Sequence, residues 1–356
     1  MSETYKIFVI NPGSTSTKVA LFENNRLIFE ETIRHDLERL KKFQSIGDQL
    51  AFRKQALLTL LATRQTGVKQ FDAVVGRGGL LRPLAGGTYR VNDRMIEDAR
   101  IGVQGEHASN LGCPLAAFTA SQAGCPAFVV DPISVDEFEP LARYSGHPLL
   151  ERKSLAHTLN IHAVSRWMAK KMEIPFEKSR FVVAHLGGGI SVAPVKGGRI
   201  VDVNDASSAG PFSPERTGTL PLQGFITLCF SGTYTEKQMR RLVMGGGGLV
   251  AYLKTNDARE VEKRIGRGDK KAREVYEAMA YQIAGEIGSM AAVLSGKVDA
   301  VVLTGGLAQS ALLTGWIRKR VSFIAPVECI PGEFEMQAMA EGALRVLTGE
   351  EKALEY

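Results

Sequence analysis

Short apolar runs alternate along the chain with longer segments in which apolar residues recur at helical spacing. The short runs predict β-strands at residues 5–10, 19–22, 26–32, 71–75, 127–131, 181–184, 192–195, 199–204 and 300–303. The longer segments predict helices at residues 47–64, 93–100, 109–123, 158–172, 237–244, 249–253, 270–294 and 335–347. Strands that alternate with helices and glycine-rich turns predict an α/β fold with mixed β-sheets, in which residues 71–75 and 127–131 form central parallel strands.

The order strand, polar turn, strand, tight turn, strand occurs twice, at residues 5–32 and again at residues 181–204. Such a recurrence indicates an internal repeat of one architecture. The length of 356 residues is about twice that of a typical single domain. We therefore expect a duplicated α/β unit, with one copy in each of two domains.

Each copy has a turn rich in glycine and hydroxyl residues between its first two strands. We call residues 11–18 (NPGSTSTK) the first loop and residues 185–191 (HLGGGIS) the second loop. Small residues expose backbone N–H groups, which together with hydroxyl groups are suitable donors to phosphate oxygens. The glycine pair at residues 305–306, between a strand and a helix start, is typical of nucleotide sites. The glycine run at residues 245–248 is a further candidate, and no Walker A spacing is present.

Single charged residues stand at or beyond the ends of apolar strands. Arg77 lies between glycines, Asp131 ends the run at residues 127–131, and Arg216 lies in a Pro-Glu-Arg-Thr-Gly segment. Ligands of open α/β sheets bind beyond the carboxyl ends of the strands, and arginine makes bidentate contacts to carboxylate and phosphate. The pattern predicts an anion site, with salt bridging as the structural alternative for each arginine.

Composition and motif searches disfavour several other classes of protein. The net charge is +6, but the densest basic run, residues 263–273, is interrupted by Asp269 and has no aromatic residue, which is poor for nucleic-acid binding. The absence of HExxH and CxxC patterns disfavours zinc, and the absence of GxSxG and GxGxxG disfavours hydrolase and Rossmann folds. Because no signal peptide and no apolar run of about 18 residues are found, we expect a cytoplasmic enzyme without a membrane or nucleic-acid partner.

These motifs, in this order, resemble those of the acetokinase family, the acetate and butyrate kinases of the sugar kinase, heat-shock 70 and actin superfamily. The resemblance covers nearly the whole chain, and residues 77–83, 106–112 and 208–218 are similar to butyrate kinases in particular. It implies duplicated ribonuclease-H-like (actin-like ATPase) domains with mixed β-sheets flanked by helices and an active-site cleft between them. Domain I would comprise residues 1–155 and 334–356, and domain II residues 156–333.

The resemblance also implies roles for the residues that match the family's motifs. The residues implied in phosphate and nucleotide binding are Asn11, Ser14, Ser16, Lys18, His185, Gly187, Gly188, Gly189, Gly305 and Gly306. The residues implied in catalysis are Arg77, Asp131, His157 and Arg216. Mg²⁺ would be held by Asp131 and, through water, by Glu335, with Glu333 as the alternative. His107 matches a family histidine near the acyl site only loosely, and the second loop reads Gly-Gly-Gly-Ile where acetate kinases carry Gly-Asn-Gly-Ala.

The implied reaction is a reversible, direct in-line phosphoryl transfer in which ATP and butyrate, or a branched short-chain carboxylate, give ADP and an acyl phosphate. The acceptor is already an anion, so cations that offset repulsion are needed rather than a general base. The alternatives are a sugar or amino-sugar kinase with Asp131 as base, and a non-metabolic, ATP-driven conformational module. The resemblance further implies a homodimer or larger homo-oligomer, while acyl-chain preference and physiological direction stay open.

Overall fold

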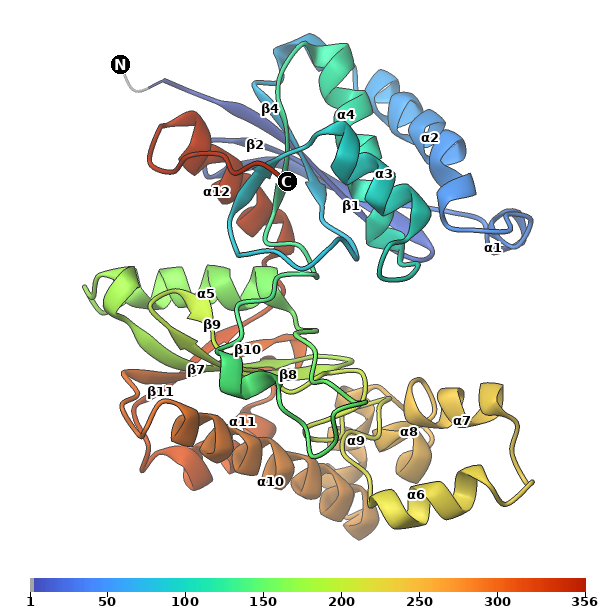
Figure 1. Ribbon diagram of the computed structural model, residues 1–356, viewed down its shortest axis with the longest axis vertical. Coiled ribbons are helices and arrows are strands. Elements are labelled where there is room, and N and C mark those ends of the chain that lie inside the picture. The colour runs from blue at the N-terminus through green and yellow to red at the C-terminus, as the bar shows by residue number, and fades with distance from the viewer. Residues whose placement is uncertain (1–2) are drawn as a thin grey trace. The chain divides into compact units, whose positions relative to one another are not determined.

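The computed structural model describes residues 3–356, which form two compact units (Figure 1). Unit 1 comprises the chain up to Asp136 together with Phe334–Tyr356, and unit 2 comprises Glu137–Glu333. Each unit contains one mixed β-sheet flanked by helices, which confirms the α/β class predicted from the hydrophobic pattern.

Unit 1 has a six-stranded sheet in the order β3-β2-β1-β4-β6-β5. The strands are β1 (Lys6–Pro12), β2 (Ser16–Glu23), β3 (Arg26–Arg34), β4 (Ala73–Arg77), β5 (Thr88–Arg90) and β6 (Ala127–Val130). The first three form an antiparallel meander, while β4 and β6 extend the sheet parallel to β1. Every residue of β4 is buried, which is typical of a central parallel strand.

Helices cover both faces of this sheet (Figure 1). They are α1 (Leu37–Leu40), α2 (Leu50–Thr63), α3 (Asp93–Ile101), α4 (Gly112–Ala123) and α12 (Glu335–Leu347), with 3₁₀ turns η1 (Gly47–Gln49), η2 (Val68–Gln70) and η3 (Ala108–Leu111). On one face, Leu57 of α2 and Leu115 of α4 join Phe8 in a buried core. On the other, Gly342 of α12 packs so closely that a Cβ there would lie 2.6 Å from the methyl groups of Val130.

Unit 2 has a five-stranded sheet in the order β11-β10-β7-β8-β9. The strands are β7 (Arg180–Leu186), β8 (Ile190–Lys196), β9 (Arg199–Ile200), β10 (Ala300–Gly305) and β11 (Val327–Pro331). As in unit 1, the first three strands form an antiparallel meander, and the later strands run parallel to the first. The duplication predicted from the sequence is therefore present in the architecture.

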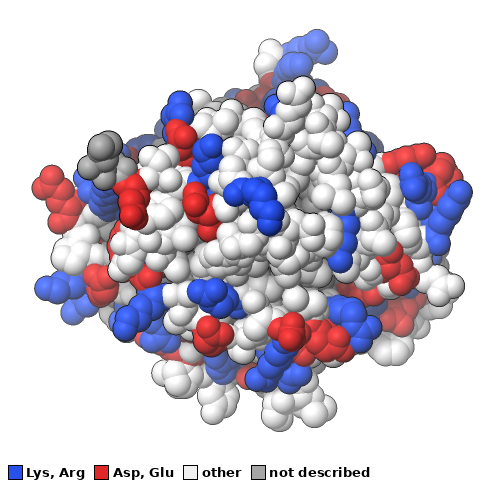
Figure 2. All heavy atoms as spheres, turned by 90° about the horizontal axis from the view of Figure 1, so that it is seen from above, with Lys and Arg blue, Asp and Glu red and all other residues white. Residues whose placement is uncertain are grey.

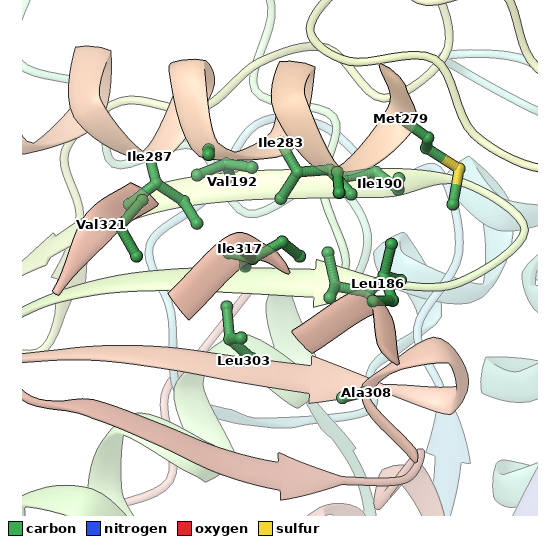
Figure 3. Close-up of a cluster of buried hydrophobic side chains, with 14 of the residues drawn as sticks. Leu186, Ile190, Val192, Met279, Ile283, Ile287, Leu303, Ala308, Ile317 and Val321 are labelled. Carbon is green, nitrogen blue, oxygen red and sulfur yellow. The ribbon is translucent and has the colours of Figure 1, made fainter. Parts of the chain in front are cut away.

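A hydrophobic core of unit 2 lies between its sheet and helices α10 and α11. The helices of unit 2 are α5 (Thr158–Lys171), α6 (Leu222–Cys229), α7 (Glu236–Val243), α8 (Gly248–Leu253), α9 (Ala258–Gly266), α10 (Lys270–Val293) and α11 (Ala311–Val321), with 3₁₀ turns η4 (Pro140–Arg143), η5 (Phe176–Lys178) and η6 (Gly306–Gln309). Met279, Ile283 and Ile287, spaced by four along α10, point toward Ile190 and Val192 of β8 (Figure 3). Full burial of each such side chain contributes about 1.5–3 kcal/mol.

The strand predicted at residues 199–204 is wrong beyond Ile200, because only Arg199–Ile200 form a ladder with β8. Farther along, the side chain of Asn204 takes the place of the backbone. Its Oδ1 accepts a hydrogen bond of 2.6 Å from the Val192 amide, and its Nδ2 donates to the Ile190 carbonyl oxygen at 2.9 Å. Pro194 of β8 has no N–H to donate, so a regular ladder would in any case be interrupted there.

Charged side chains of both signs are mixed on the face of the molecule drawn in Figure 2, with no extended area of one sign. The excess of basic residues is therefore dispersed there. Among the helices formed by residues 3–356, none is both long enough and apolar enough to cross a bilayer.

Candidate active site

Three of the predicted residues meet at the carboxyl ends of neighbouring strands of unit 1. Asn11 lies near the end of β1, Arg77 ends β4, and Glu335 begins α12. The Glu335 carboxylate lies 3.0 Å from Nη2 of Arg77 and accepts a 2.7 Å hydrogen bond from the Asn11 side chain. Arg77 is buried, and within residues 3–356 its Nη1 atom has no hydrogen-bond acceptor. Because such an atom is costly to bury unpaired, Nη1 of Arg77 is a candidate donor to an anionic ligand.

Asp131 follows the last residue of β6 in a backbone conformation that is uncommon outside glycine. Its φ is +38°, its side chain is buried, and its Oδ1 accepts a 2.7 Å hydrogen bond from the Gly87 amide. Val130 pairs in register with Arg77, so Asp131 and Arg77 share one edge of the sheet. Residues held in sparsely populated conformations cost about 1–3 kcal/mol and cluster at functional sites. The strain at Asp131 therefore supports its selection as a site residue.

The other predicted residues of unit 1 lie in the first loop. Ser14 is exposed, and Ser16 is half-buried at the start of β2. Lys18 pairs in register with Asn11, but its Nζ lies 3.3 Å from a carboxylate oxygen of Glu30, and its side chain is 44% exposed. Exposed ion pairs of this kind are weak, so Lys18 stays available to an anionic ligand.

His107 lies beside the Arg77 cluster in an uncharged form. Burial is the largest cause that lowers the pKa of His107, and the charge of Arg77 is the second. The charge of Glu335 raises this pKa. Its Nδ1 accepts a hydrogen bond from the Ser109 amide at 3.2 Å, so in the neutral ring the proton is on Nε2. His107 therefore adds a hydrogen-bond donor to this edge of the sheet without adding charge.

The two histidines predicted in unit 2 stack on each other, with ring centroids 4.0 Å apart and ring planes inclined by 11°. His157 lies at the start of α5, and its Nδ1 is 2.9 Å from the Ser191 hydroxyl of the second loop. His185 lies on β7, paired in register with Ser191 and with Thr304 of β10. The structure therefore brings both histidines to the second loop.

Asn160 determines which nitrogen of His185 carries the proton. Its Nδ2 lies 2.9 Å from His185 Nδ1 and donates to the Thr304 hydroxyl at 3.1 Å, while that hydroxyl donates to the Gly332 carbonyl. Since Nδ2 is a donor, His185 Nδ1 must accept, and the proton lies on Nε2. Sequence reasoning missed Asn160. The feature that could have identified it is a polar amide side chain in the first turn of a helix whose first eight residues are all buried.

Arg216 packs against the glycines of the second loop. A Cβ at Gly189 would lie 2.4 Å from Nη1 of Arg216, so only glycine leaves room for the guanidinium group. Nη1 donates to the Ala206 carbonyl oxygen at 2.8 Å, and Nε is buried with no acceptor in the described part of the chain. Burial is the main cause that lowers the pKa of Arg216. Ser213 ties the segment to the loop, because its hydroxyl donates to the Gly188 carbonyl and accepts from the Arg216 amide.

Two further glycines stand where β10 ends. Gly305 has a φ of +87°, and a Cβ there would lie 2.4 Å from the Leu186 carbonyl oxygen, so a side chain is excluded. Gly306 has open space around its Cα and lines an open pocket of about 670 Å³. The residues that line this pocket are Asn256, Asp257, Ala258, Arg259, Glu262, Gly306, Leu307, Gln309 and Ser310. A pocket of this size and polarity, at the carboxyl end of a parallel strand, is large enough for a nucleoside.

The glycine run at residues 245–248 packs against the Arg216 segment. The Gly245 and Gly247 amides both donate to the Glu215 carbonyl oxygen, and a Cβ at Gly248 would overlap the Ser213 carbonyl oxygen at 1.7 Å. Close packing therefore explains the glycines at Gly247 and Gly248, whereas Gly245 has open space around it and a φ of +105°. None of them lines the pocket beside Gly306.

Mg²⁺ is the metal that the resemblance implies. Within residues 3–356, no group of three or more His, Cys, Asp or Glu side chains is placed to hold a metal ion. Mg²⁺ usually keeps several waters and is bound by one or two carboxylates plus substrate phosphates. Asp131 is one such carboxylate, and both oxygens of Glu335 contact Asn11 or Arg77. This donor set fits a magnesium ion held mainly by phosphate and water; Glu333, the alternative, belongs to unit 2.

Comparison with known proteins gives concordant matches. The sequence model of the acetokinase family matches residues 143–322. The chain is 51% identical over 353 residues to butyrate kinase 2 of Clostridium acetobutylicum, covering 99% of both sequences. It is similar to the crystal structure of an acetate kinase from Porphyromonas gingivalis, with a TM-score of 0.78, 18% identity and coverage of 96% of this chain and 100% of the other.

A second solved structure is a propionate kinase from Francisella tularensis, with a TM-score of 0.72, 17% identity and coverage of 95% of this chain and 98% of the other. At these identities the likeness to solved structures shows the fold. The fold is that of the actin-like ATPases, with two mixed sheets flanked by helices, as the resemblance to the acetokinase family implied.

Proposed function

The chain belongs to the acetokinase family and is a carboxylate kinase of the butyrate kinase type, and we propose that it reversibly converts ATP and butyrate, or a branched short-chain carboxylate, to ADP and an acyl phosphate. The observation that carries the proposal within the structure is the pair of buried guanidinium nitrogens, Nη1 of Arg77 and Nε of Arg216, which have no acceptor among residues 3–356. Two such donors suit a reaction in which an anion attacks an anion.

The proposed chemistry is a direct in-line transfer. A carboxylate oxygen attacks the γ-phosphorus of ATP, the bond from that phosphorus to the β,γ-bridging oxygen breaks, and ADP leaves with the bond electrons. The transition state is loose, with charge on three equatorial oxygens, so catalysis depends on positioning and on charge stabilisation. We assign Arg77 to the carboxylate and Arg216 to the transferred phosphoryl group. No proton has to be removed from the acceptor, so Asp131 acts through its charge.

Other residues of the two loops provide hydrogen bonds to phosphate oxygens. Nε2 of His185 is a donor because Asn160 fixes the tautomer, and His157 stacks against the same ring. In the first loop, the hydroxyl groups of Ser14 and Ser16 are the corresponding donors. Mg²⁺, when bound, neutralises phosphate charge, with Asp131 and Glu335 as the proposed carboxylates. The pocket beside Gly306 is the proposed adenosine site.

A sugar or amino-sugar kinase is the weaker alternative. A neutral hydroxyl acceptor needs a general base and has no need of two arginines, whereas each arginine here has a buried donor nitrogen without an acceptor among residues 3–356. The buried Asp131 is the residue that would serve as base. Phosphorylation of a hexose or an amino sugar in place of carboxylates would favour this alternative.

We also propose a homo-oligomer, on the basis of α6. None of its residues is buried; Leu222 and Ile226 are 72% and 50% exposed, and Phe230, the C-cap that follows the helix, is 86% exposed. These residues are spaced by four, so they form one apolar stripe, and apolar stripes on a surface mark interaction sites. Phe230→Asp should reduce the molar mass measured by light scattering, whereas Phe323→Asp, at a residue 84% exposed and outside the stripe, should not. An unchanged mass in Phe230→Asp would contradict this use of α6.

The cytoplasm is the proposed location. Cys113, Cys125, Cys229 and Cys329 are all free thiols in the structure. Unpaired cysteines fit a reducing compartment.

The function is tested by hydroxamate formation from ATP, Mg²⁺, hydroxylamine and straight or branched acids of two to five carbons. The wild-type protein should give product with butyrate, and Arg77→Ala and Arg216→Ala should each lower kcat by about 10²–10³-fold, as loss of a well-placed donor does. Arg100→Ala and Arg240→Ala, which remove exposed ion pairs with Glu97 and Glu236, are the matched controls. Absence of product with every acid would refute the proposal, and near-normal turnover of both site variants would refute the assigned roles.

A further inference from the structure

Arg53 is a buried cation beneath the first loop. It lies on α2, and its side chain is 0% exposed. Nη1 donates to the carbonyl oxygens of Gly13 at 2.8 Å and Ser16 at 2.9 Å, and Nη2 donates to that of Ser14 at 3.1 Å. Gln49, one turn earlier, accepts from both Nε and Nη2. The guanidinium group therefore holds three carbonyl groups of one loop at once.

All the hydrogen-bond acceptors of Arg53 are neutral. The last of them is the hydroxyl of Thr17, which lies 3.1 Å from Nη1 of Arg53. The same hydroxyl lies 2.8 Å from Nε2 of His35. Burial lowers the pKa of Arg53 to about 10, so the group is still a cation at neutral pH. Burial, and then Arg53, lower the pKa of His35 to about 4, so that ring is neutral. The loop thus has one buried positive charge behind it, and no carboxylate neutralises that charge within residues 3–356.

The contacts with Arg53 also fix where the loop amides point. In a trans peptide the C=O and N–H groups of one plane point in opposite directions. The Gly13 and Ser14 carbonyls point to Arg53, so the amides of Ser14 and Thr15 point away from it. In the described chain neither amide donates to a protein acceptor. Consecutive amides that point outward form a concave donor pair for an anion.

We propose that Arg53 is a positioning residue for phosphoryl transfer. It holds the carbonyl side of the first loop, thereby aiming the amides of Ser14 and Thr15 at the phosphoryl group, and its charge offsets part of the repulsion between the two anions. The inference rests on the proposed function and adds a group that never touches the substrate. Lysine is not equivalent, because one ammonium group does not match the planar fork that serves three carbonyls.

The test compares three variants with a matched control. Arg53→Lys keeps the charge, Gln49→Leu removes the acceptor that orients Arg53, and Arg53→Ala leaves space for free guanidinium ion. Arg82→Met is the control, because Arg82 is a half-exposed partner of the buried Asp98 in unit 1 and has no contact with the loop. Circular dichroism and thermal unfolding first establish which variants are folded.

We expect kcat to fall about 10²-fold in Arg53→Lys and less in Gln49→Leu, because a displacement of about 1 Å costs about that much. KM for the carboxylate should change less than kcat, and millimolar guanidinium should restore part of the activity of Arg53→Ala. Amide exchange at Gly13 and His35, which donate to the Ser16 and Thr15 carbonyl oxygens at 2.8 and 2.9 Å, should become faster. Arg82→Met should keep kcat even if its melting temperature falls.

Wild-type kcat in folded Arg53→Lys and Gln49→Leu would overturn the proposal, as would failure of guanidinium to restore folded Arg53→Ala. If the wild-type protein itself is inactive with every short carboxylate, the proposed function fails instead. Amide exchange of Gly13 and His35, which are hydrogen-bonded to the loop carbonyls, then decides the matter in Arg53→Lys, since unchanged exchange would show that Arg53 does not organise the loop.

Discussion

Gly189→Ala is predicted to lower turnover by displacing Arg216 while the fold stays intact. Gly189 is buried, and its φ lies outside the left-handed region, so alanine fits the backbone conformation. The obstacle is the guanidinium group, whose Nη1, Cζ and Nη2 atoms would lie 2.4, 2.7 and 3.2 Å from the new Cβ. A planar cation that is already half-buried has to move.

The size of the effect follows from the distances. Ordinary van der Waals contact begins at 3.4 Å, and the closest atom would lie at 2.4 Å, so the group must shift by about 1.0 Å (3.4 − 2.4). A misplacement of about 1 Å in a catalytic group costs about 10²-fold in rate, which corresponds to about 2.7 kcal/mol of transition-state stabilisation. The loss should appear in kcat, because the contact of Arg216 with the phosphoryl group is proposed to strengthen during transfer.

Gly188→Ala is the matched comparison for this assay. It changes the neighbouring glycine, but the atom nearest to its new Cβ would be a carboxylate oxygen of Glu215 at 3.5 Å, an ordinary contact. Steady-state hydroxamate kinetics should therefore place kcat of Gly189→Ala about 10²-fold below that of Gly188→Ala. Equal values for the two folded variants would refute the reasoning, because the effect would then belong to loop stiffness and not to Arg216.

Three further predictions concern single residues. Asn160→Asp should reverse the tautomer of His185, because a carboxylate accepts the Nδ1 proton; ¹⁵N chemical shifts of the ring should report the change, with kcat about 10–100-fold lower. The pKa of His35 in the folded protein is about 4, below its ordinary value of 6.5. The neutral ring therefore stabilises the fold fully above pH 6.5, and the free energy of unfolding falls by up to about 1.4 kcal/mol per pH unit from pH 6.5 toward pH 4. Urea unfolding should show this slope in the wild type and its loss in His35→Gln. Gly306→Leu should raise KM for ATP at least about tenfold with unchanged thermal stability, since a Cβ there meets no heavy atom within 4 Å and the residue lines the proposed adenosine pocket; an unchanged KM would place the adenosine elsewhere.

Long segments with a clear hydrophobic period were predictable from the sequence. The helix expected at residues 335–347 is α12 (Glu335–Leu347), and the buried apolar runs became β4 and β6. The hydrophobic pattern did not predict α6. None of the residues of this helix is buried, so its apolar residues do not follow the face of a hydrophobic core. The pattern missed β5, since three residues carry no period. It also gave no indication of β11 and α9, and it indicated only a helix start after the glycine pair at residues 305–306, without the bounds of α11.

Residues of the candidate site were predictable where the chemistry requires a particular side chain at a strand end. Arg77 and Asp131 are of this kind, and the structure places both at one sheet edge. Arg53 and Asn160 were not, because each acts through a partner distant in sequence, such as Gly13 or Thr304. A helical pattern assigns positions to faces but does not show which loop lies opposite a buried polar side chain.

The Asn204 side chain gives the sheet of unit 2 an unusual border. Its carboxamide offers one acceptor and one donor to β8 as a peptide group would, so Val192 and Ile190 are paired although no strand residue faces them. An open row of such groups is a template for addition of a foreign strand and hence for aggregation. The Asn204 side-chain amide pairs these groups of β8 without adding a strand with an unpaired edge of its own. Pro194 has no N–H group, so one donor fewer is exposed along β8. Beside the two-residue β9, the second copy of the meander therefore presents fewer unpaired backbone groups to which a foreign strand could add.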